Sequence, residues 1–182
     1  MTKAQRRRAT TAVHEAGHAV AAVMAGARIT AVTLHDDPNT PGSCTFEDLP
    51  AGKDAAVTYA GPWCEARLRF GASPRLEHIQ AAIAENPGDH SDLTEYGPPL
   101  PRNTESLLET CWPTIVALAA MLYAEGSLTH RDVTAALGIP ERDGHLSSAA
   151  GSIRMGFEPG TFTTYEPGTY FSGSHDRHQR TE

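Results

Sequence analysis

Residues 9–26 read Ala-Thr-Thr-Ala-Val-His-Glu-Ala-Gly-His-Ala-Val-Ala-Ala-Val-Met-Ala-Gly and decide much of the fold. The stretch contains no proline and consists mainly of residues that favour helices. Thr10 or Thr11 can cap a first turn, and Gly26 suits the position just after a helix C-terminus. The sequence therefore predicts a helix over residues 10–25.

Within this helix, His14, Glu15 and His18 form an H-E-x-x-H motif. Side chains four residues apart project from the same helix face, so both imidazoles can reach one Zn²⁺ ion at about 2.0–2.1 Å. Glu15 lies about 100° around the axis from His14, where it can act on a zinc-bound water instead of binding the metal. The motif predicts a zinc peptidase with Glu15 as the general base. The alternative is two solvent-facing histidines on a structural helix.

A third protein ligand is expected from elsewhere in the chain, because catalytic zinc sites usually use three and keep one position open. The residues alone leave this choice open, although the acidic cluster at residues 89–92 is favoured because it opens a helix. A single acid in such a place is otherwise a helix cap or a surface charge. The candidates are Glu65, Asp89, His90, Asp92 and His130.

Outside the motif, the pattern of apolar and turn-forming residues predicts short alternating elements. A β-strand is expected over 28–34, paired with a second over 44–46. The predicted helices cover 51–70 in two pieces broken at Gly61-Pro62, then 76–85, 104–125, and 129–137 with Thr129 as its cap. Residues 86–92 are predicted to form a loop.

Composition narrows the class of protein. Fifteen basic against 22 acidic residues give a net charge of -7, which disfavours binding to nucleic acid or to anionic lipid. The basic cluster at residues 6–8 is interpreted as a solvated arm. Three cysteines without a C-x-x-C pair indicate neither a disulfide framework nor a zinc knuckle, so a cytoplasmic location is expected. No stretch reaches the roughly 20 apolar residues of a membrane span, so no membrane insertion is expected.

Four blocks of the sequence resemble the peptidase domain of the FtsH-type AAA+ zinc metalloproteases. Residues 12–20 (AVHEAGHAV) are similar to the family's zinc helix, and residues 60–66 (AGPWCEA) to its G-G-R-x-A-E-E helix. Residues 88–93 (GDHSDL) resemble its G-A-x-N-D-L segment, and residues 112–133 its closing pair of helices. The resemblance spans about residues 9–137.

The resemblance implies a predominantly helical α+β fold, in which a zincin-like H-E-x-x-H helix lies beside a small β-sheet edge. It carries the third zinc ligand over to Asp92, so the implied metal set is His14, His18 and Asp92. Glu65 is then implied as a second-shell carboxylate that orients a zinc-bound histidine. The implied domain covers residues 1–140, and residues 141–182, rich in Gly, Pro, Ser and His, are expected to be a loosely ordered extension.

Together these observations predict a zinc metalloendopeptidase that cleaves unfolded or extended polypeptides, with substrate pairing along the exposed edge of the 28–34 strand. Because the sequence has no P-loop motif, the activity is expected to be independent of ATP. A homo-oligomer or a separate ATPase partner stays open. The alternative is a catalytically silent zinc-containing module that binds a peptide or a partner.

Overall fold

Helix α1 (Lys3–Ala25) begins seven residues earlier than the sequence pattern predicted. The computed structural model describes residues 1–37, 40–96 and 102–161. A capping box at the N-terminus of α1 explains why the helix begins at Lys3. Thr2 Oγ1 accepts from the Gln5 amide at 3.2 Å, and Gln5 Oε1 accepts from the Thr2 amide at 2.8 Å. Arg6-Arg7-Arg8 therefore belong to the helix and do not form an arm, although Arg6 and Arg7 are exposed to solvent as expected. The helix ends as predicted at Gly26, in a left-handed conformation with φ of 109°.

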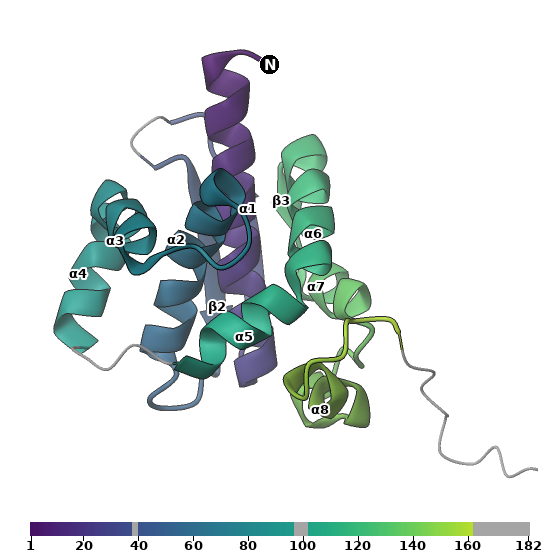
Figure 1. Cartoon of the computed structure of the whole chain (residues 1–182). Helices are drawn as coiled ribbons and strands as arrows, with labels where there is room; N and C mark the ends of the chain where they lie inside the picture. Colours follow the sequence, from purple (N-terminus) through teal and green to yellow (C-terminus); the bar gives the residue numbers. More distant parts are fainter. Residues whose placement is uncertain (38–39, 97–101, 162–182) are drawn as a thin grey trace, which may run out of the picture.

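The remaining elements confirm a predominantly helical α+β fold with a small antiparallel sheet (Figure 1). Helix α1 runs through the middle, with α2 and α6 packed against it (Figure 1). In chain order the other elements are β1 (Arg28–Leu34), β2 (Gly42–Glu47), α2 (Asp54–Phe70), α3 (Leu76–Glu85), α4 (Pro87–Tyr96), α5 (Arg102–Thr110), α6 (Trp112–Glu125), β3 (Ser127–Leu128), α7 (His130–Leu137), the 3-10 turn η1 (Gly144–Leu146) and α8 (Ser148–Arg154).

The sheet has the order β2-β1-β3, with both pairings antiparallel. Val32 lies opposite Cys44 on β2 and opposite Leu128 on β3, so the predicted pairing of the first two strands is confirmed. Strand β1 is central, however, because β3 pairs with it on the side away from β2. The predicted pairing of a substrate with an exposed edge of β1 therefore conflicts with the order of the strands. Strand β2 is an edge strand of this sheet.

Helix α2 is continuous, against the predicted break at Gly61-Pro62. Proline costs a helix one hydrogen bond, but the surrounding turns are buried against α1, which outweighs that loss. Gly17 on α1 permits the close approach, because a Cβ there would lie 2.7 Å from Cys64 Sγ and 2.9 Å from the Ala60 carbonyl oxygen. The two helices that carry the site are therefore packed backbone against backbone.

The predicted helix over 104–125 is two helices, α5 and α6, bent by 67° at Cys111. Pro113 explains the break, since it lacks the amide that a continuous helix would bond to the Glu109 carbonyl. Within the described ranges no single helix is long and apolar enough to cross a membrane, and α5 with α6 passes such a test only as this bent pair.

Two further predictions are corrected. Residues 87–96 form helix α4 where a loop was predicted for 86–92. The expectation of a loosely ordered extension fails for residues 141–161, because α8 buries Ala149, Ala150 and Ile153 and Arg154 donates to the Met24 carbonyl at 2.8 Å. The rest of that extension, 162–182, lies outside the described residues.

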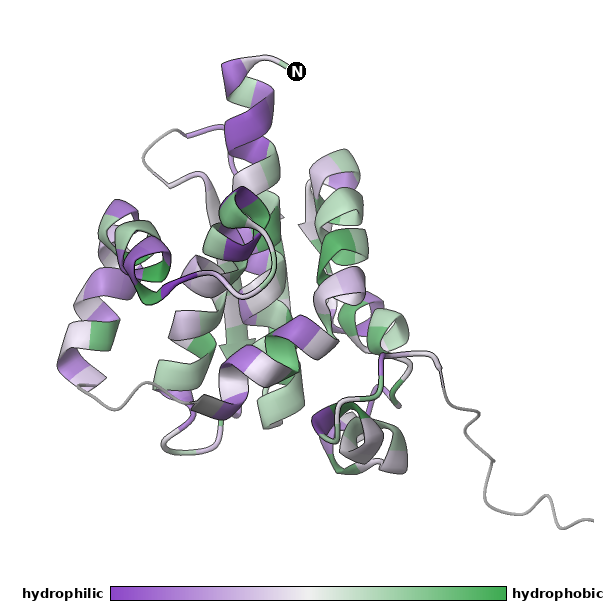
Figure 2. Cartoon of the chain, in the orientation of Figure 1, coloured by the Kyte–Doolittle hydropathy of each residue, from purple (hydrophilic) through white to green (hydrophobic). Residues whose placement is uncertain are grey.

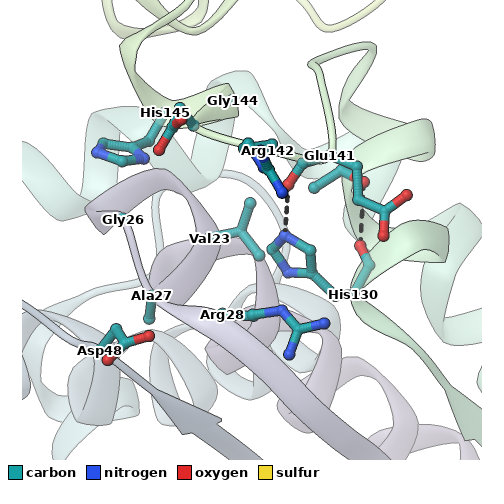
Figure 3. Close-up of a pocket in the computed structure, with 12 residues that line it drawn as sticks. Val23, Gly26, Ala27, Arg28, Asp48, His130, Glu141, Arg142, Gly144 and His145 are labelled. Carbon is teal, nitrogen blue, oxygen red and sulfur yellow. Dashed lines mark hydrogen bonds between the residues drawn. The ribbon is translucent and has the colours of Figure 1, made fainter.

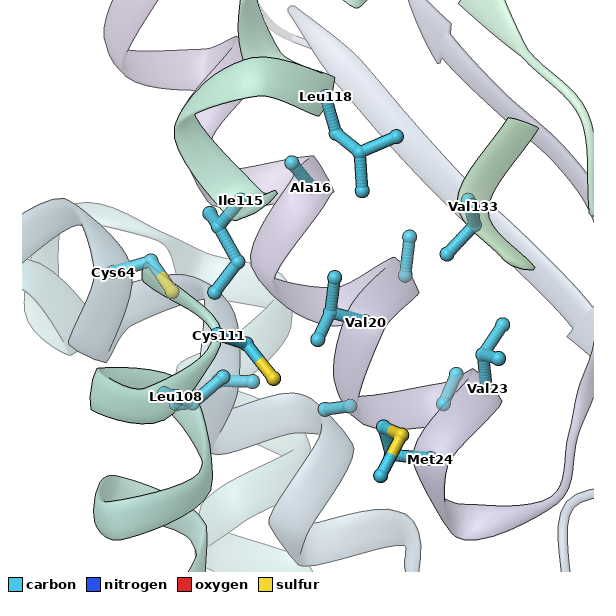
Figure 4. Packing of buried hydrophobic residues seen from close by; sticks show 14 of the residues in the cluster. Ala16, Val20, Val23, Met24, Cys64, Leu108, Cys111, Ile115, Leu118 and Val133 are labelled. Carbon is cyan, nitrogen blue, oxygen red and sulfur yellow. The ribbon is translucent and has the colours of Figure 1, made fainter. Parts of the chain in front are cut away.

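The core lies where α1, α2, α5, α6 and α7 meet (Figure 4). Hydropathy follows this arrangement: the lower turns of α1 are apolar, whereas its N-terminal end is hydrophilic (Figure 2). The most deeply buried side chains of this core include Val20, Leu108, Ile115, Leu118, Leu122 and Val133.

Candidate metal centre

His14 and His18 face one another from successive turns of α1. Both side chains are buried, and their Nε2 atoms lie 2.9 Å apart with the ring planes at 78°. His18 Nδ1 lies 2.8 Å from the Val57 carbonyl oxygen of α2, which can only accept a hydrogen bond. Nδ1 therefore carries the proton, and in the neutral ring Nε2 presents its lone pair to the shared position.

Asp89, in the first turn of α4, completes the group. Its Oδ2 lies 3.0 Å from His14 Nε2 and its Oδ1 lies 3.6 Å from His18 Nε2. With the 2.9 Å between the two Nε2 atoms, the donor atoms of the three residues are close enough for one metal ion to contact them all. Among the described residues, His14, His18 and Asp89 are the group of three whose ligand atoms all lie within 4.8 Å of one another.

Asp92, the ligand implied by the resemblance, is not brought to the histidines. It lies three residues after Asp89 on the same helix, about 4.5 Å further along the axis, and its side chain is exposed. The acidic segment favoured in the sequence thus reaches the histidines through Asp89 and not through Asp92. The cause is that α4 begins at Pro87, so its first turn, not its second, meets α1 and α2.

The other two candidates from the sequence lie elsewhere. His90 is exposed on α4. His130 accepts a hydrogen bond from the Ile29 amide at Nδ1 (3.2 Å) and donates from Nε2 to the Glu141 carbonyl (3.0 Å). It lines a separate pocket at the far end of α1 with Arg28 and His145 (Figure 3). Its role is structural, because both ring nitrogens are used.

Glu65 lies where the resemblance implied, behind His14. Its Oε2 is 3.3 Å from His14 Nδ1, and the carboxylate is itself held by Asn86, which donates from Nδ2 at 3.0 Å, and by an ion pair with Arg69. Burial alone would raise the pKa of Glu65, but its contacts with His14, Asn86 and Arg69 lower it below the ordinary value. Glu65 is therefore held as an anion beside His14 Nδ1, a position from which a carboxylate can orient a metal-bound histidine.

Asn86 was missed in the sequence. It lies between α3 and α4 and donates its second amide proton to the Ala82 carbonyl at 2.8 Å. Both amide protons are thus used to hold Glu65 against the C-terminal turn of α3. The only signal for it was its position immediately before Pro87, which marks a helix boundary.

Glycines allow the backbone to approach the site from two sides. A Cβ on Gly61 would come within 2.7 Å of His14 Nε2, so α2 forms one wall of the centre. A Cβ on Gly42, at the start of β2, would come within 2.8 Å of Glu15 Oε1. Sequence reasoning treated Gly61 as a helix breaker, because spacing alone does not show which backbone faces a ligand.

Glu15 is buried beside the histidines and is not part of the ligand group. Burial raises the pKa of Glu15, against the lowering effect of His18 and His14. A carboxylate whose pKa is raised towards neutrality is suited to accept a proton and return it.

The electrostatics of the group favour a cation. Burial alone would lower the pKa of His14, yet Asp89 and Glu65 raise it to about 10. Asp89 Oδ2 is buried and accepts no hydrogen bond from a described residue. A buried anionic oxygen beside two imidazole nitrogens fits a divalent metal, and this N, N, O donor set is one that zinc accepts.

The site opens into a cleft of about 880 Å³ between α1, the start of β2 and the α3–α4 junction. His14, Glu15, His18 and Asp89 all line it, and so does Gly42. The arrangement therefore combines three metal-binding side chains, one carboxylate free to move a proton, and access for a large ligand.

A metal-binding H-E-x-x-H helix with a distant acid is the arrangement of a metallopeptidase-like protein. In keeping with this class, a family model described as Peptidase M50B-like matches residues 4–66, about a third of the chain. The matched stretch includes His14, Glu15, His18 and Glu65 but ends before Asp89. A comparison with curated proteins found no match.

Proposed function

We propose that the chain is a zinc-dependent metalloendopeptidase that hydrolyses peptide bonds of unfolded or extended polypeptides without ATP. The observation that carries the proposal is the convergence of His14 Nε2, His18 Nε2 and the Asp89 carboxylate on one point, with Glu15 beside them. The Peptidase M50B-like match supports the reaction class.

The chain's own groups would divide the chemistry between them. His14, His18 and Asp89 would hold zinc, which when bound supplies a Lewis acid that acidifies water and polarises a carbonyl. Glu15 would accept the proton from the attacking water and deliver it to the leaving amine. Glu65 would hold His14, and the Val57 carbonyl would hold His18, so that both rings keep their orientation.

The position of β2 beside the cleft supports an extended substrate. Strand β2 pairs with β1 on one side, and its first residue, Gly42, lies against Glu15 and lines the cleft. A peptide in extended conformation could add to the free edge of β2 and place its backbone beside Glu15. This replaces the predicted pairing with β1, which lies inside the sheet.

Among the metallopeptidases, we propose that this chain is related to the FtsH-type peptidase domain. The residues that follow the M50B-like match, which ends at residue 66, also support this relation. Asp89 lies in the 88–93 segment that carries this resemblance, and outside the stretch matched by the M50B-like model. Activity without ATP is part of this proposal, and hydrolysis in the absence of any nucleotide tests it. A cytoplasmic location is proposed from the three unpaired cysteines.

Hydrolysis of casein by the zinc-loaded protein tests the proposal. We expect cleavage that a chelator abolishes and added zinc restores. Glu15→Gln should keep one zinc per chain but lose activity by at least about a hundredfold, because removal of a positioned general base typically costs 10²–10⁴ in rate.

Two outcomes would contradict the proposal. Full activity of Glu15→Gln would remove Glu15 from the mechanism. Stoichiometric zinc without cleavage of casein or of flexible peptides would favour the silent, peptide-binding alternative.

A further inference from the structure

The cleft continues past the metal centre along the N-terminal turns of α1. Lys3, Arg6 and Arg7 line this part of it, on the same wall as His14. Their spacing of three and four residues places them on one face of the helix, here called the basic face. The hydrophilic N-terminal end of α1 is visible in Figure 2.

The basic face is unfavourable for the helix itself. The first turn of α1 contains no acidic residue, and cations near a helix N-terminus oppose the helix dipole. Arg8, outside the basic face, is paired with Asp36 at 3.5 Å. Neither Lys3 nor Arg6 has an ion pair within the described part of the chain. Positive charge is thus concentrated here in a chain whose net charge is -7.

Four carboxylates line the cleft, and each is already engaged away from the basic face. Asp89 lies at the two histidines and Glu15 is buried beside them. Glu65 and Glu85 are both bound to Arg69, which lines the cleft as well. The end of the cleft beyond the metal centre therefore presents cations to whatever occupies it. Cations that destabilise the helix N-terminus are expected at a binding cleft where the function requires positive charge.

We propose that the basic face binds acidic side chains of the polypeptide substrate, and this inference rests on the proposed function. Arg6 precedes His14 by eight residues, about 12 Å along the helix, and Lys3 by about 16 Å. An extended peptide advances about 3.3 Å per residue. The preferred substrate segment therefore carries Asp or Glu about three to five residues from the scissile bond.

Binding of two labelled peptides tests the inference separately from catalysis. The peptides share one sequence, except that Glu at three to five residues on either side of the central bond in one is Gln in the other. With zinc-loaded Glu15→Gln, fluorescence anisotropy should give at least tenfold tighter binding of the Glu peptide at low ionic strength. Rising salt should reduce this difference, because exposed charges are screened.

Charge reversal identifies the surface. Lys3→Glu with Arg6→Glu, in the same background, should abolish the preference for the Glu peptide. The matched control is Arg131→Glu on α7, which is exposed, does not line this cleft and should leave the preference unchanged.

Equal or undetectable binding of the two peptides, or a preference that survives the charge reversal, overturns the inference. Competition by single-stranded DNA as strong as that of the Glu peptide also overturns it, in favour of a nucleic-acid ligand. Hydrolysis of both peptides by the wild-type protein with equal kcat/KM refutes the inference alone. A binding preference without any hydrolysis refutes the proposed function alone.

Discussion

Gly61 of α2 lies directly against His18 of α1, so close that a methyl group at Gly61 would collide with the His18 ring, and it would also stand 2.7 Å from His14 Nε2. Gly61→Ala should therefore push the ligand atoms apart and lower zinc content well below one equivalent. Mass spectrometry of bound metal checks this.

The matched control is Gly151→Ala on α8, where an added Cβ meets no atom within 4 Å. It should keep its zinc and gain about 0.5–1 kcal/mol in stability. Equal zinc in both variants would show that the α2 backbone is not a wall of the site.

Asp89 and Asp92 provide a second paired test on one helix. Asp89→Ala removes a metal ligand, and its zinc affinity should fall by more than the 10–100-fold typical of outer-shell changes. Asp92→Ala should bind zinc like the wild type, because Asp92 is exposed outside the ligand group. Competition with a chromogenic chelator measures both affinities. Loss of zinc in the Asp92 variant with retention in the Asp89 variant would restore the assignment implied by the FtsH-type resemblance.

The contact between Glu65 and His14 predicts an indirect effect on the metal. Glu65→Gln removes the anion beside His14, and Asn86→Ala removes the amide that holds this anion in place, so each should weaken zinc binding by about 10–100-fold. The double variant should be little worse than Glu65→Gln alone, since Asn86 acts through Glu65. The same chelator competition measures all three. Additive losses in the double variant would mean that Asn86 acts by another route.

A site residue could be placed from the sequence when its partners lie close to it in the chain, and could not when they lie on a distant element. His14, Glu15 and His18 lie within two turns of one helix, and the Thr129 cap lies next to its helix, so their geometry is set by helical spacing alone. Asp89 depends on where α4 begins and on how α4 meets α1. A one-turn error there exchanges Asp89 for Asp92.

The misread elements had non-local causes too. Pro62 was expected to break α2, but burial against α1 keeps the helix intact. Residues 141–161 have the composition of a loose extension, yet Ile153 is fully buried and Arg154 donates to a carbonyl of α1, more than a hundred residues away. The composition of a segment gives the number of its apolar side chains, but not whether another part of the fold packs against them.

The capping box of α7 predicts a pH-dependent contribution to stability. Asp132 Oδ2 accepts hydrogen bonds from the Thr129 amide and hydroxyl, both at 2.7 Å, and these bonds lower the pKa of Asp132. A carboxylate whose pKa is lower in the folded state stabilises that state above its unfolded pKa, about 3.9, and loses this effect as pH falls through the folded value. Asp132→Ala should therefore cost about 0.3–1 kcal/mol at pH 7, the range for a solvent-exposed anion in the first turn of a helix, and progressively less below pH 4. Urea unfolding across this range measures the difference, with Asp92→Ala as the control at an exposed site. A difference that stays constant down to pH 2 would show that the charge of Asp132 plays no part in the cap.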